Sequence, residues 1–314
     1  MRTSCAQSER NEQTRTAVRA SLEPVSFGEQ EAGRGDKRKN MHEFELIAKY
    51  LAPLAGPGGL GLKDDAALLN VPAAEQLVVT TDTLNEGVHF KAGTAPERLA
   101  QKALRVNLSD LAAMGATPLG YTLNLSLPKD TRADFFAAFC EGLKRDQALF
   151  NIALLGGDTT RTDGPLSITI TAYGHTPSPL LRSGAKAGDT VYVSSAIGAG
   201  YLGLKGHSTE TIQHYECPEP QLALGQTLRG FATACMDISD GLVQDLRHLC
   251  AASGVGARIE LARIPLADKA YDPIPQITGG DDYVLLFTGP KDLAMDATTI
   301  GEITNNKGVE LLDT

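Results

Sequence analysis

The spacing of apolar residues in the first half of the globular region alternates between helical and extended patterns. Apolar side chains that recur every three or four positions predict helices over 42–52, 96–114 and 132–150. Short apolar runs bounded by turn-forming residues predict strands over 77–81, 121–127, 152–155 and 166–173. The Gly156-Gly157-Asp158 segment is expected to be a turn between two of these strands.

The second half of the chain contains a similar mixture of elements after a break near Thr176-Pro177-Ser178-Pro179. The same criteria predict strands over 190–194, 235–238, 257–261 and 283–287, and helices over 220–233 and 242–252. Because both halves mix strands with helices, we expect an α/β or α+β fold class. At about 150 residues per domain, the 314 residues predict two domains, which we place at 41–178 and 179–314.

Residues 1–40 differ from the rest of the chain because they are polar and charged, with little apolar periodicity. We expect them to form a disordered extension. The globular pattern begins at Met41, which is also a candidate translation start.

Composition narrows the function classes. A net charge of −9 argues against a protein that binds the nucleic-acid backbone, which requires a basic face. The five cysteines contain no C-x-x-C pair, which favours reduced thiols and a cytoplasmic location. No apolar run reaches the roughly 18 residues of a membrane span, and the N-terminus lacks the apolar region of a secretory signal. We therefore expect neither nucleic acid nor membrane as a partner.

Aspartates in turns and at the ends of predicted strands are the most informative polar residues. They are Asp64, Asp65, Asp82, Asp110, Asp158, Asp237, Asp240, Asp281 and Asp282. Any one of them has an ordinary explanation, because aspartate is common in turns and at helix N-caps. As a set they predict a site for magnesium ions around a polyphosphate, since Mg²⁺ binds carboxylate oxygens together with phosphate and water.

Other nucleotide and catalytic motifs do not account for this pattern. Of two G-x-G-x-x-G matches, the one at 56–61 has no preceding strand. The one at 198–203 follows a strand, but Gly206-His207-Ser208 interrupts the helix that a dinucleotide site requires. The sequence contains no P-loop, no protein-kinase motif set and no G-x-S-x-G nucleophile motif. His89 stands in a predicted loop, where a solvated histidine is the ordinary explanation.

A series of segments resembles the thiamine-monophosphate kinase family in order and spacing from about residue 42 to 290. The segments are 43–48 (EFELIA), 64–69 (DDAALL), 80–83 (TTDT), 87–90 (GVHF), 102–116 (KALRVNLSDLAAMGA), 156–161 (GGDTTR), 182–186 (RSGAK), 237–242 (DISDGL) and 279–283 (GGDDY). The resemblance implies a two-domain fold shared with aminoimidazole ribonucleotide synthetase and selenophosphate synthetase. Its N-terminal α/β domain forms a homodimer interface, and a C-terminal α+β domain packs beside it.

The resemblance also implies a phosphotransferase with a phosphate group as acceptor, which converts ATP and thiamine monophosphate to ADP and thiamine diphosphate. It implies magnesium ligation by Asp65, Thr80, Thr81, Asp82, Asp110, Asp158, Asp237 and Asp240. It implies ATP contacts from Gly157, Asp158, Arg182 and Ser239, and substrate contacts from His89 and Asp281. No covalent nucleophile is expected, so the phosphoryl group is transferred directly and in line.

The chain departs from the family pattern at several points. Lys63 stands in the Gly61-Leu-Lys-Asp-Asp65 segment where the family usually has glycine, and Ala199 stands where it usually has an acid. The C-terminal domain is expected to be truncated at its C-terminal end, before the family's aromatic segment. Two alternatives stay open: another ATP-dependent enzyme of the superfamily, and a degenerate Mg-ATP-binding homologue without catalysis.

Overall fold

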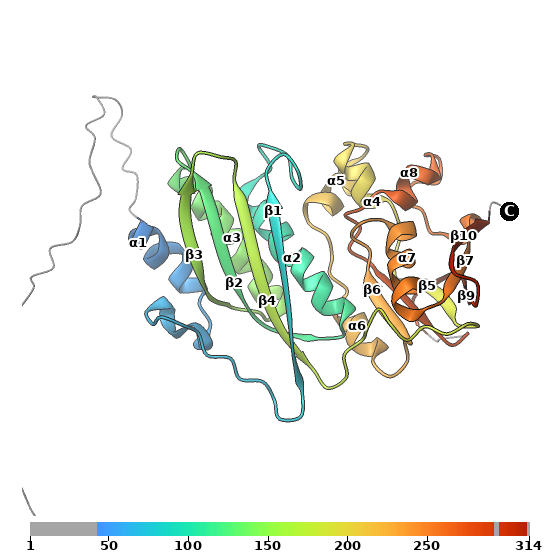
Figure 1. The fold of residues 1–314 in the computed structure, drawn as a ribbon. Coiled ribbons are helices and arrows are strands. Elements are labelled where there is room, and N and C mark those ends of the chain that lie inside the picture. Colours follow the sequence, from blue (N-terminus) through green and yellow to red (C-terminus); the bar gives the residue numbers. More distant parts are fainter. Residues whose placement is uncertain (1–42, 292–294, 313–314) are drawn as a thin grey trace, which may run out of the picture. The chain divides into compact units, whose positions relative to one another are not determined.

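The computed structural model describes residues 43–291 and 295–312, and the expected extension over 1–40 lies outside them. Within these residues the chain forms two sheets with helices packed on them (Figure 1). The part built on the first sheet is called the first lobe here, and the part built on the second sheet is called the second lobe.

The first lobe contains a four-stranded sheet in the order β1-β4-β2-β3. The strands are β1 (Gln76–Asn85), β2 (Thr117–Pro128), β3 (Leu154–Thr162) and β4 (Ser167–Thr176). β4 is antiparallel to β1 and β2, whereas β2 and β3 are parallel. Because side chains alternate along a strand, β1 turns Thr80 and Asp82 to one face and the more exposed Leu77 and Val79 to the other.

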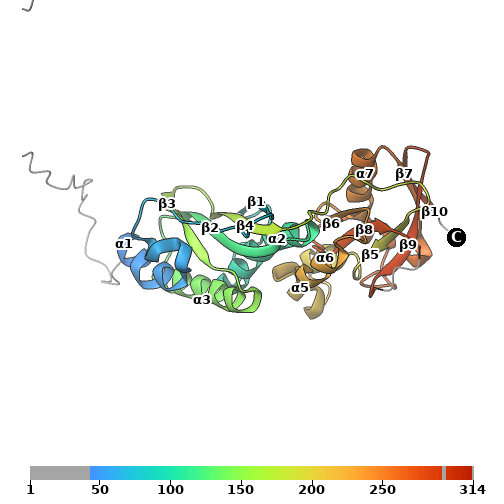
Figure 2. The same ribbon diagram turned by 90° about the horizontal axis from the view of Figure 1, so that it is seen from below.

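Two long helices, α2 (Pro96–Ala113) and α3 (Ala133–Phe150), cover one face of this sheet, as Figures 1 and 2 show. A proline suits the first turn of α2, where its missing N–H has no intrahelical partner to lose. α3 ends where Asn151 adopts a left-handed conformation. The helices and the sheet share one hydrophobic cluster, in which Leu104 is fully buried.

The helix predicted over 42–52 is divided into shorter helical turns. They are α1 (Glu43–Leu46) and the π-helical η1 (Ile47–Leu51), and two 3-10 segments follow, η2 (Ala52–Leu54) and η3 (Pro57–Leu62). Proline in the first turn of both η2 and η3 starts a new turn in each case.

The second lobe contains a six-stranded sheet in the order β10-β7-β9-β5-β8-β6. Its strands are β5 (Thr190–Val193), β6 (Ala234–Asp237), β7 (Gly256–Glu260), β8 (Leu285–Gly289), β9 (Thr298–Thr304) and β10 (Gly308–Leu312). Its helices are α4 (Ala199–Leu204), α5 (Thr209–Glu216), α6 (Leu222–Leu228), α7 (Leu242–Ser253), η4 (Leu261–Arg263) and α8 (Pro273–Thr278). A second hydrophobic cluster fills this lobe.

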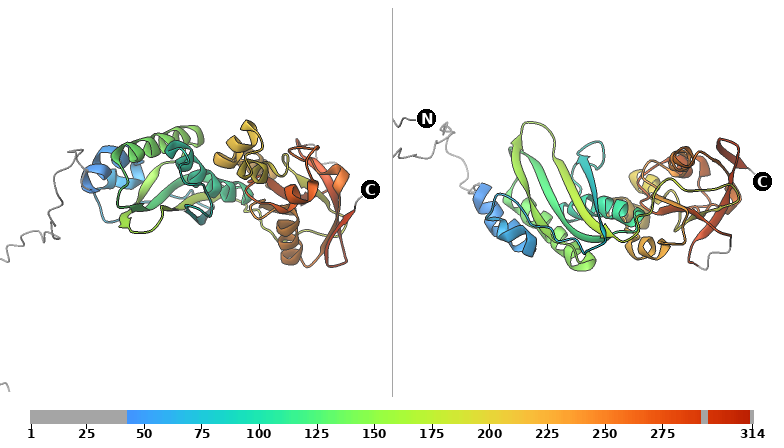
Figure 3. Two further views of the ribbon diagram at one scale, coloured as in Figure 1. Left: turned by 90° about the horizontal axis from the view of Figure 1, so that it is seen from above. Right: turned by 60° about the horizontal axis from the view of Figure 1, so that its bottom comes forward.

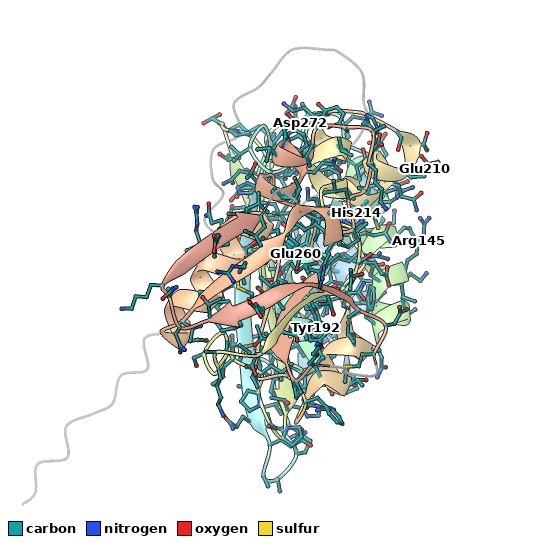
Figure 4. All side chains as sticks on the ribbon, turned by 90° about the vertical axis from the view of Figure 1, so that its right-hand side faces the viewer. Arg145, Tyr192, Glu210, His214, Glu260 and Asp272 are labelled. Carbon is teal, nitrogen blue, oxygen red and sulfur yellow. The ribbon has the colours of Figure 1, made fainter. Side chains whose placement is uncertain are left out.

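A third hydrophobic cluster, called the joining cluster, connects the two lobes. Its buried members are Ala112, Ala113, Leu180, Tyr192, Leu228, Cys235, Leu285 and Phe287. The C-terminal end of α2 lies next to α6, as Figures 1 and 3 show. Tyr192, labelled in Figure 4, stacks on Phe287 with 5.2 Å between ring centroids. The lobes therefore share apolar packing.

Three predicted boundaries are wrong. Gly156-Gly157-Asp158 is part of β3, where it pairs with β2, because a glycine-rich segment allows the two strands to approach closely. Asp82 lies inside β1, since the strand continues to Asn85 with alternating polar residues. The helix predicted over 220–233 is only Leu222–Leu228.

Within the described ranges, no helix is long and apolar enough to cross a membrane.

Candidate active site

Three carboxylates from different elements form a group that we call the carboxylate cluster: Asp82 from β1, Asp110 from α2 and Asp237 from the end of β6. They line a cavity of about 450 Å³. Thr80, Arg182 and Ser239 also line it. Two of these carboxylates come from the first lobe and one from the second, so the lobe contact assembles the group.

Burial raises the pKa values of all three carboxylates, and repulsion by Asp110 adds to the rise for Asp82 and Asp237. Desolvation, followed by the charge of Asp110, raises the pKa of Asp82 to about 6. The same two causes raise the pKa of Asp237 to about 7, and burial raises that of Asp110. Like charges in a desolvated site favour protonation or a counter-cation. The cluster is therefore suited to binding a cation.

Neighbouring groups hold these carboxylates in place. The Thr80 hydroxyl donates a hydrogen bond to Asp110, and the Ser109 hydroxyl donates one to Asp237 Oδ2 at 2.7 Å. The Arg182 guanidinium acts against the rise in pKa of both Asp110 and Asp237. The positive charge of Arg182 thus offsets part of the repulsion within the cluster.

The turn after β6 is organised by a carboxylate that follows it. Asp245 Oδ2 accepts hydrogen bonds from the backbone N–H groups of Ser239, Asp240 and Gly241, each at 3.1 Å. Gly241, not Ser239, is the N-cap of α7. The side chains of Ser239 and Asp240 stay exposed, and Asp240 accepts a hydrogen bond from Gln244 at 3.1 Å.

A second cavity, of about 330 Å³, contains other predicted site residues. Its lining includes Asp65, Asp158 and Gly157, and also the apolar Leu51 and Leu62. We call it the β3 cavity. The exposed Lys63 is not among the residues that line it.

Gly157 is required at this position by geometry. Its φ is +152°, and a Cβ atom there would stand 1.8 Å from the carbonyl oxygen of Leu123 on β2. Only glycine adopts this conformation without strain. The neighbouring Asp158 is fixed by the N–H of Thr159, which donates to its Oδ1 at 2.9 Å.

The two predicted substrate residues meet around a lysine, and we call this group the Lys102 cluster: His89, Lys102, Tyr215, Asp281 and Tyr283. Lys102 Nζ donates to Asp281 Oδ2 at 3.1 Å and to the His89 carbonyl oxygen at 3.2 Å. The Tyr283 hydroxyl donates to Asp281 Oδ1 at 2.9 Å. The Tyr215 hydroxyl donates to the His89 carbonyl oxygen at 3.0 Å.

Asp281 stands in a strained segment. Both Asp281 (φ +64°) and Tyr283 (φ +52°) are left-handed, which costs energy for residues other than glycine. Between them, buried Asp282 accepts the N–H groups of Gly198 and Gly200, each at 3.0 Å to Oδ1. His214, labelled in Figure 4, is hydrogen-bonded through Nε2 to the Asp282 carbonyl oxygen at 2.8 Å.

Tyr283 connects this group to the carboxylate cluster. Its pKa is raised by burial, then by the charge of Asp281, and also by the charges of Asp237 and Asp82. The charges of Asp281, Asp237 and Asp82 therefore all act on the Tyr283 hydroxyl.

Thr81 is placed apart from Thr80 and Asp82. Its side chain is on the opposite face of β1, where the hydroxyl donates to the Ile170 carbonyl oxygen at 3.1 Å. The structure thus divides the predicted set. The carboxylate cavity holds Thr80, Asp82, Asp110, Arg182, Asp237 and Ser239, and the β3 cavity holds Asp65, Gly157 and Asp158.

Sequence reasoning missed Lys102, Ser109, Tyr215, Asp245 and Tyr283. A signal existed for Lys102, because it stands among the apolar residues of a helix that is buried along most of its length. A charged residue in such a position requires a partner, and the partner comes from a distant segment that the sequence pattern does not identify.

Among residues 43–291 and 295–312, no three His, Cys, Asp or Glu side chains are gathered tightly enough to hold a metal ion by themselves. Magnesium usually takes only one or two carboxylates, with water and phosphate completing its shell. The carboxylate cluster, whose members have raised pKa values, fits that requirement.

Comparison with known proteins defines the class. Residues 63–176 match the AIR synthase related protein N-terminal domain, and residues 186–313 match the corresponding C-terminal domain. The chain therefore has the two-domain AIR synthase-related fold.

Closer relatives define the family. The chain is 41 % identical over 300 residues to thiamine-monophosphate kinase of Caulobacter vibrioides, covering 85 % of each chain. It is 42 % identical over 272 residues to the enzyme of that name from Salmonella typhimurium, covering 79 % of this chain and 83 % of the relative. The chain belongs to the thiamine-monophosphate kinase family.

Solved structures agree with this assignment. Thiamine-monophosphate kinase from Stenotrophomonas maltophilia K279a superposes with a TM-score of 0.77 and 38 % identity, over 86 % of this chain and 96 % of that one. The complex of AaThiL with AMPPCP and TMP gives a TM-score of 0.73 and 32 % identity, over 87 % and 94 %. E. coli HypE, at 20 % identity and a TM-score of 0.71 over 86 % and 93 %, shares the fold.

Proposed function

We propose that the chain transfers the γ-phosphoryl group of ATP to thiamine monophosphate and releases ADP and thiamine diphosphate. The observation that carries the proposal is the assembly of three carboxylates with raised pKa values, from both lobes, around one cavity. Membership of the thiamine-monophosphate kinase family supports the same reaction, as does a related structure described with AMPPCP and TMP.

The carboxylate cluster would hold magnesium ions. Such ions neutralise the phosphate oxygens and the charge that develops during transfer. Asp82, Asp110 and Asp237 supply oxygen ligands, and Thr80 orients Asp110 through its hydroxyl. Asp240 and the backbone carbonyl oxygen of Thr81 are further candidate ligands.

The β3 cavity suits the nucleotide. Its apolar residues can receive a base, and Asp65 and Asp158 can receive a metal-bound phosphate. Gly157 lets β3 pass close to the Leu123 backbone of β2, which places Asp158 beside the cavity. Arg182, at the edge of the neighbouring cavity, offers a planar pair of donors to phosphate oxygens, and the exposed Ser239 hydroxyl adds a donor.

His89 presents one defined donor to the substrate. Its Nδ1 accepts the backbone N–H of Asn85 at 3.0 Å, so the proton of the neutral ring is on Nε2. Nε2 has no hydrogen-bond partner among the described residues and is available to a phosphate oxygen. Asp281 is oriented from both sides by Lys102 and Tyr283.

The chemistry requires no covalent intermediate. An oxygen of the thiamine phosphate attacks the γ-phosphorus, and the bond from that phosphorus to the bridging oxygen of ADP breaks. The attacking group is already an ionised phosphate, so orientation and charge neutralisation account for most of the catalysis.

The open face of the first sheet suits a homodimer. Leu77 and Val79 of β1 are exposed there at 47 % and 54 %, and hydroxyl pairs such as Thr83–Thr169 continue the surface. We assign nucleotide binding and dimerisation to residues 41–178, and the α+β domain to 179–314.

ATP as co-substrate and the free thiols of Cys140, Cys217, Cys235 and Cys250 support a cytoplasmic location.

The test is a direct assay with purified chain, magnesium, ATP and thiamine monophosphate, in which chromatography measures thiamine diphosphate and ADP. Equal amounts of the two products are expected. ATP consumption with a different acceptor would support another enzyme of the superfamily. Magnesium-dependent ATP binding without turnover would support a degenerate homologue, and either result would overturn the proposal.

A further inference from the structure

Lys102 is a buried cation that contacts both predicted substrate residues. Its side chain is only 2 % exposed, whereas that of Asp281 is 29 % exposed. The ammonium group lies 3.6 Å from the centre of the Tyr215 ring. A lysine is rarely buried to this extent unless its charge is matched and its donors are used.

The partners of Lys102 come from segments far apart in the chain. Lys102 itself is on α2, the His89 carbonyl oxygen belongs to the loop after β1, and Asp281 belongs to the left-handed segment before β8. Tyr215 reaches the same carbonyl oxygen from α5. One ammonium group thus connects the first lobe to the segment of the second lobe that carries Asp281.

Burial separates Lys102 from direct substrate contact. A side chain that is 2 % exposed offers almost no surface to a ligand, whereas Asp281 and His89 are both partly accessible. Tyr283 holds one oxygen of Asp281 and Lys102 holds the other. Losing Lys102 would free half of this carboxylate and remove a donor from the His89 carbonyl oxygen.

We propose that Lys102 is a positioning residue for thiamine monophosphate: it sets the orientation of the Asp281 carboxylate and of the His89 loop, through which the substrate is held. This inference rests on the proposed function and adds a residue to its substrate site. It separates two roles, because the Lys102 cluster serves the phosphate acceptor and the β3 cavity serves the nucleotide.

The chain offers a matched control on the same helix. Arg105 is one turn further along α2 and is also buried, and its guanidinium binds Asp146 at 2.8 Å and Glu219 at 2.9 Å. Neither of these carboxylates belongs to the site. Arg105→Met therefore removes a buried cation of α2 without touching the Lys102 cluster.

The experiment compares Lys102→Met and Arg105→Met with the wild-type chain, each assayed below its own unfolding temperature. Lys102→Met is expected to raise KM for thiamine monophosphate by roughly tenfold or more, the ratio typical of lost hydrogen bonds to a charged group. KM for ATP should stay within about twofold. Arg105→Met should lower the unfolding temperature and leave both KM values within that range.

A double-mutant cycle with Asp281→Asn identifies the route of the effect. If Lys102 acts through Asp281, adding Lys102→Met to Asp281→Asn changes KM for thiamine monophosphate by less than about threefold. The double variant has no unpaired buried cation or anion at this contact, so it keeps the comparison available even where Lys102→Met alone does not fold.

Two results would overturn the inference while leaving the proposed function intact. One is an equal rise in KM for both substrates, or a profile like that of Arg105→Met. The other is a tenfold further change in the Asp281→Asn background. Absence of thiamine diphosphate from the wild-type chain would instead overturn the proposed function, and the inference with it.

Discussion

Asp82 shows how a single side chain carries both a cost and a function. It is partly buried on the inner face of β1, and burial and Asp110 raise its pKa to about 6. At neutral pH, without a cation, its charge opposes folding, because the unfolded chain solvates it fully. The same charge attracts magnesium, so a substitution affects stability and activity in opposite directions.

Asp82→Asn is expected to stabilise the metal-free protein and to impair catalysis. The gain in unfolding free energy should be no more than about 1 kcal/mol, because the side chain is partly solvated and its charge is screened. Turnover should fall by roughly a hundredfold, as for the loss of one electrostatic group in an active site. Thermal unfolding in a chelator and the thiamine diphosphate assay measure the two effects. Near-normal turnover would remove Asp82 from the metal site.

The raised pKa values of Asp82 (about 6), Asp237 (about 7) and Asp282 (about 7) also predict a pH dependence. Each native pKa exceeds the unfolded value of 3.8, so the native state binds more protons than the unfolded state between about pH 4 and 7. The contribution of these groups to stability is therefore largest below about pH 4 and falls as pH rises to about 7.

In the presence of a chelator, the contribution of these three carboxyl groups to the free energy of unfolding should fall as pH rises from 5 to 8. Magnesium with ATP should stabilise the protein more at pH 8 than at pH 6, since ligation requires deprotonated carboxylates. Differential scanning fluorimetry across this range measures both trends. A magnesium effect that is constant with pH would argue against ligation by Asp82 and Asp237.

At the scale of elements, β3 forms part of the β3 cavity, which we propose receives the nucleotide. Its parallel pairing with β2 brings Gly157 against the Leu123 carbonyl oxygen. A turn would be free to move, whereas a strand fixed by its neighbour holds Asp158 at one position beside the cavity. The close pairing of β3 with β2 therefore depends on the absence of a side chain at residue 157.

Gly157→Ala is expected to destabilise the protein by about 3 kcal/mol or more, because its Cβ would overlap backbone and the φ angle is unfavourable. Gly156→Ala is the matched control. No atom lies within 4 Å of a Cβ built there, so its effect should be within about 0.5 kcal/mol. Denaturant unfolding of both variants measures the difference. Equal losses of stability in the two variants would show that the close approach to Leu123 does not restrict residue 157 to glycine.

Local pattern predicts most long elements, and the errors have physical causes. The helix over 96–114 closely matches α2 (Pro96–Ala113), because its apolar spacing extends over many turns. The sequence predicts a turn at Gly156-Gly157-Asp158, since glycine pairs are common in turns. In the structure the segment continues β3, because only glycine allows the close approach to β2. Lys102 was missed because its counter-charge, Asp281, is 179 positions away, and only the folded chain brings them together.

At the scale of the whole described chain, the site depends on contacts between the lobes. Asp82 and Asp110 belong to the first lobe and Asp237 to the second, and Ser109 donates to Asp237 across that contact. The family resemblance predicted these residues as a set. The division of the whole predicted set between the carboxylate cavity and the β3 cavity was not accessible from the sequence, because it depends on tertiary packing.

The open face of the first sheet makes a prediction at this scale. Leu77→Asp should lower the mass of the particle measured by light scattering, because the introduced carboxylate would be desolvated at the proposed dimer interface. The substitution lies on the face of β1 opposite Asp82, so the fold of the monomer should be unchanged. A wild-type chain that is monomeric at all concentrations tested would contradict the proposed interface.

Cys235 belongs both to the joining cluster and to the lining of the carboxylate cavity. It is 2 % exposed, and burial raises the pKa of its thiol. A thiol reagent attacks the ionised, accessible form, so Cys235 is inert while the lobes are packed together. In a variant that keeps Cys235 as its sole cysteine, the rate of thiol labelling therefore measures how often the lobes separate transiently. Bound nucleotide is expected to lower that rate.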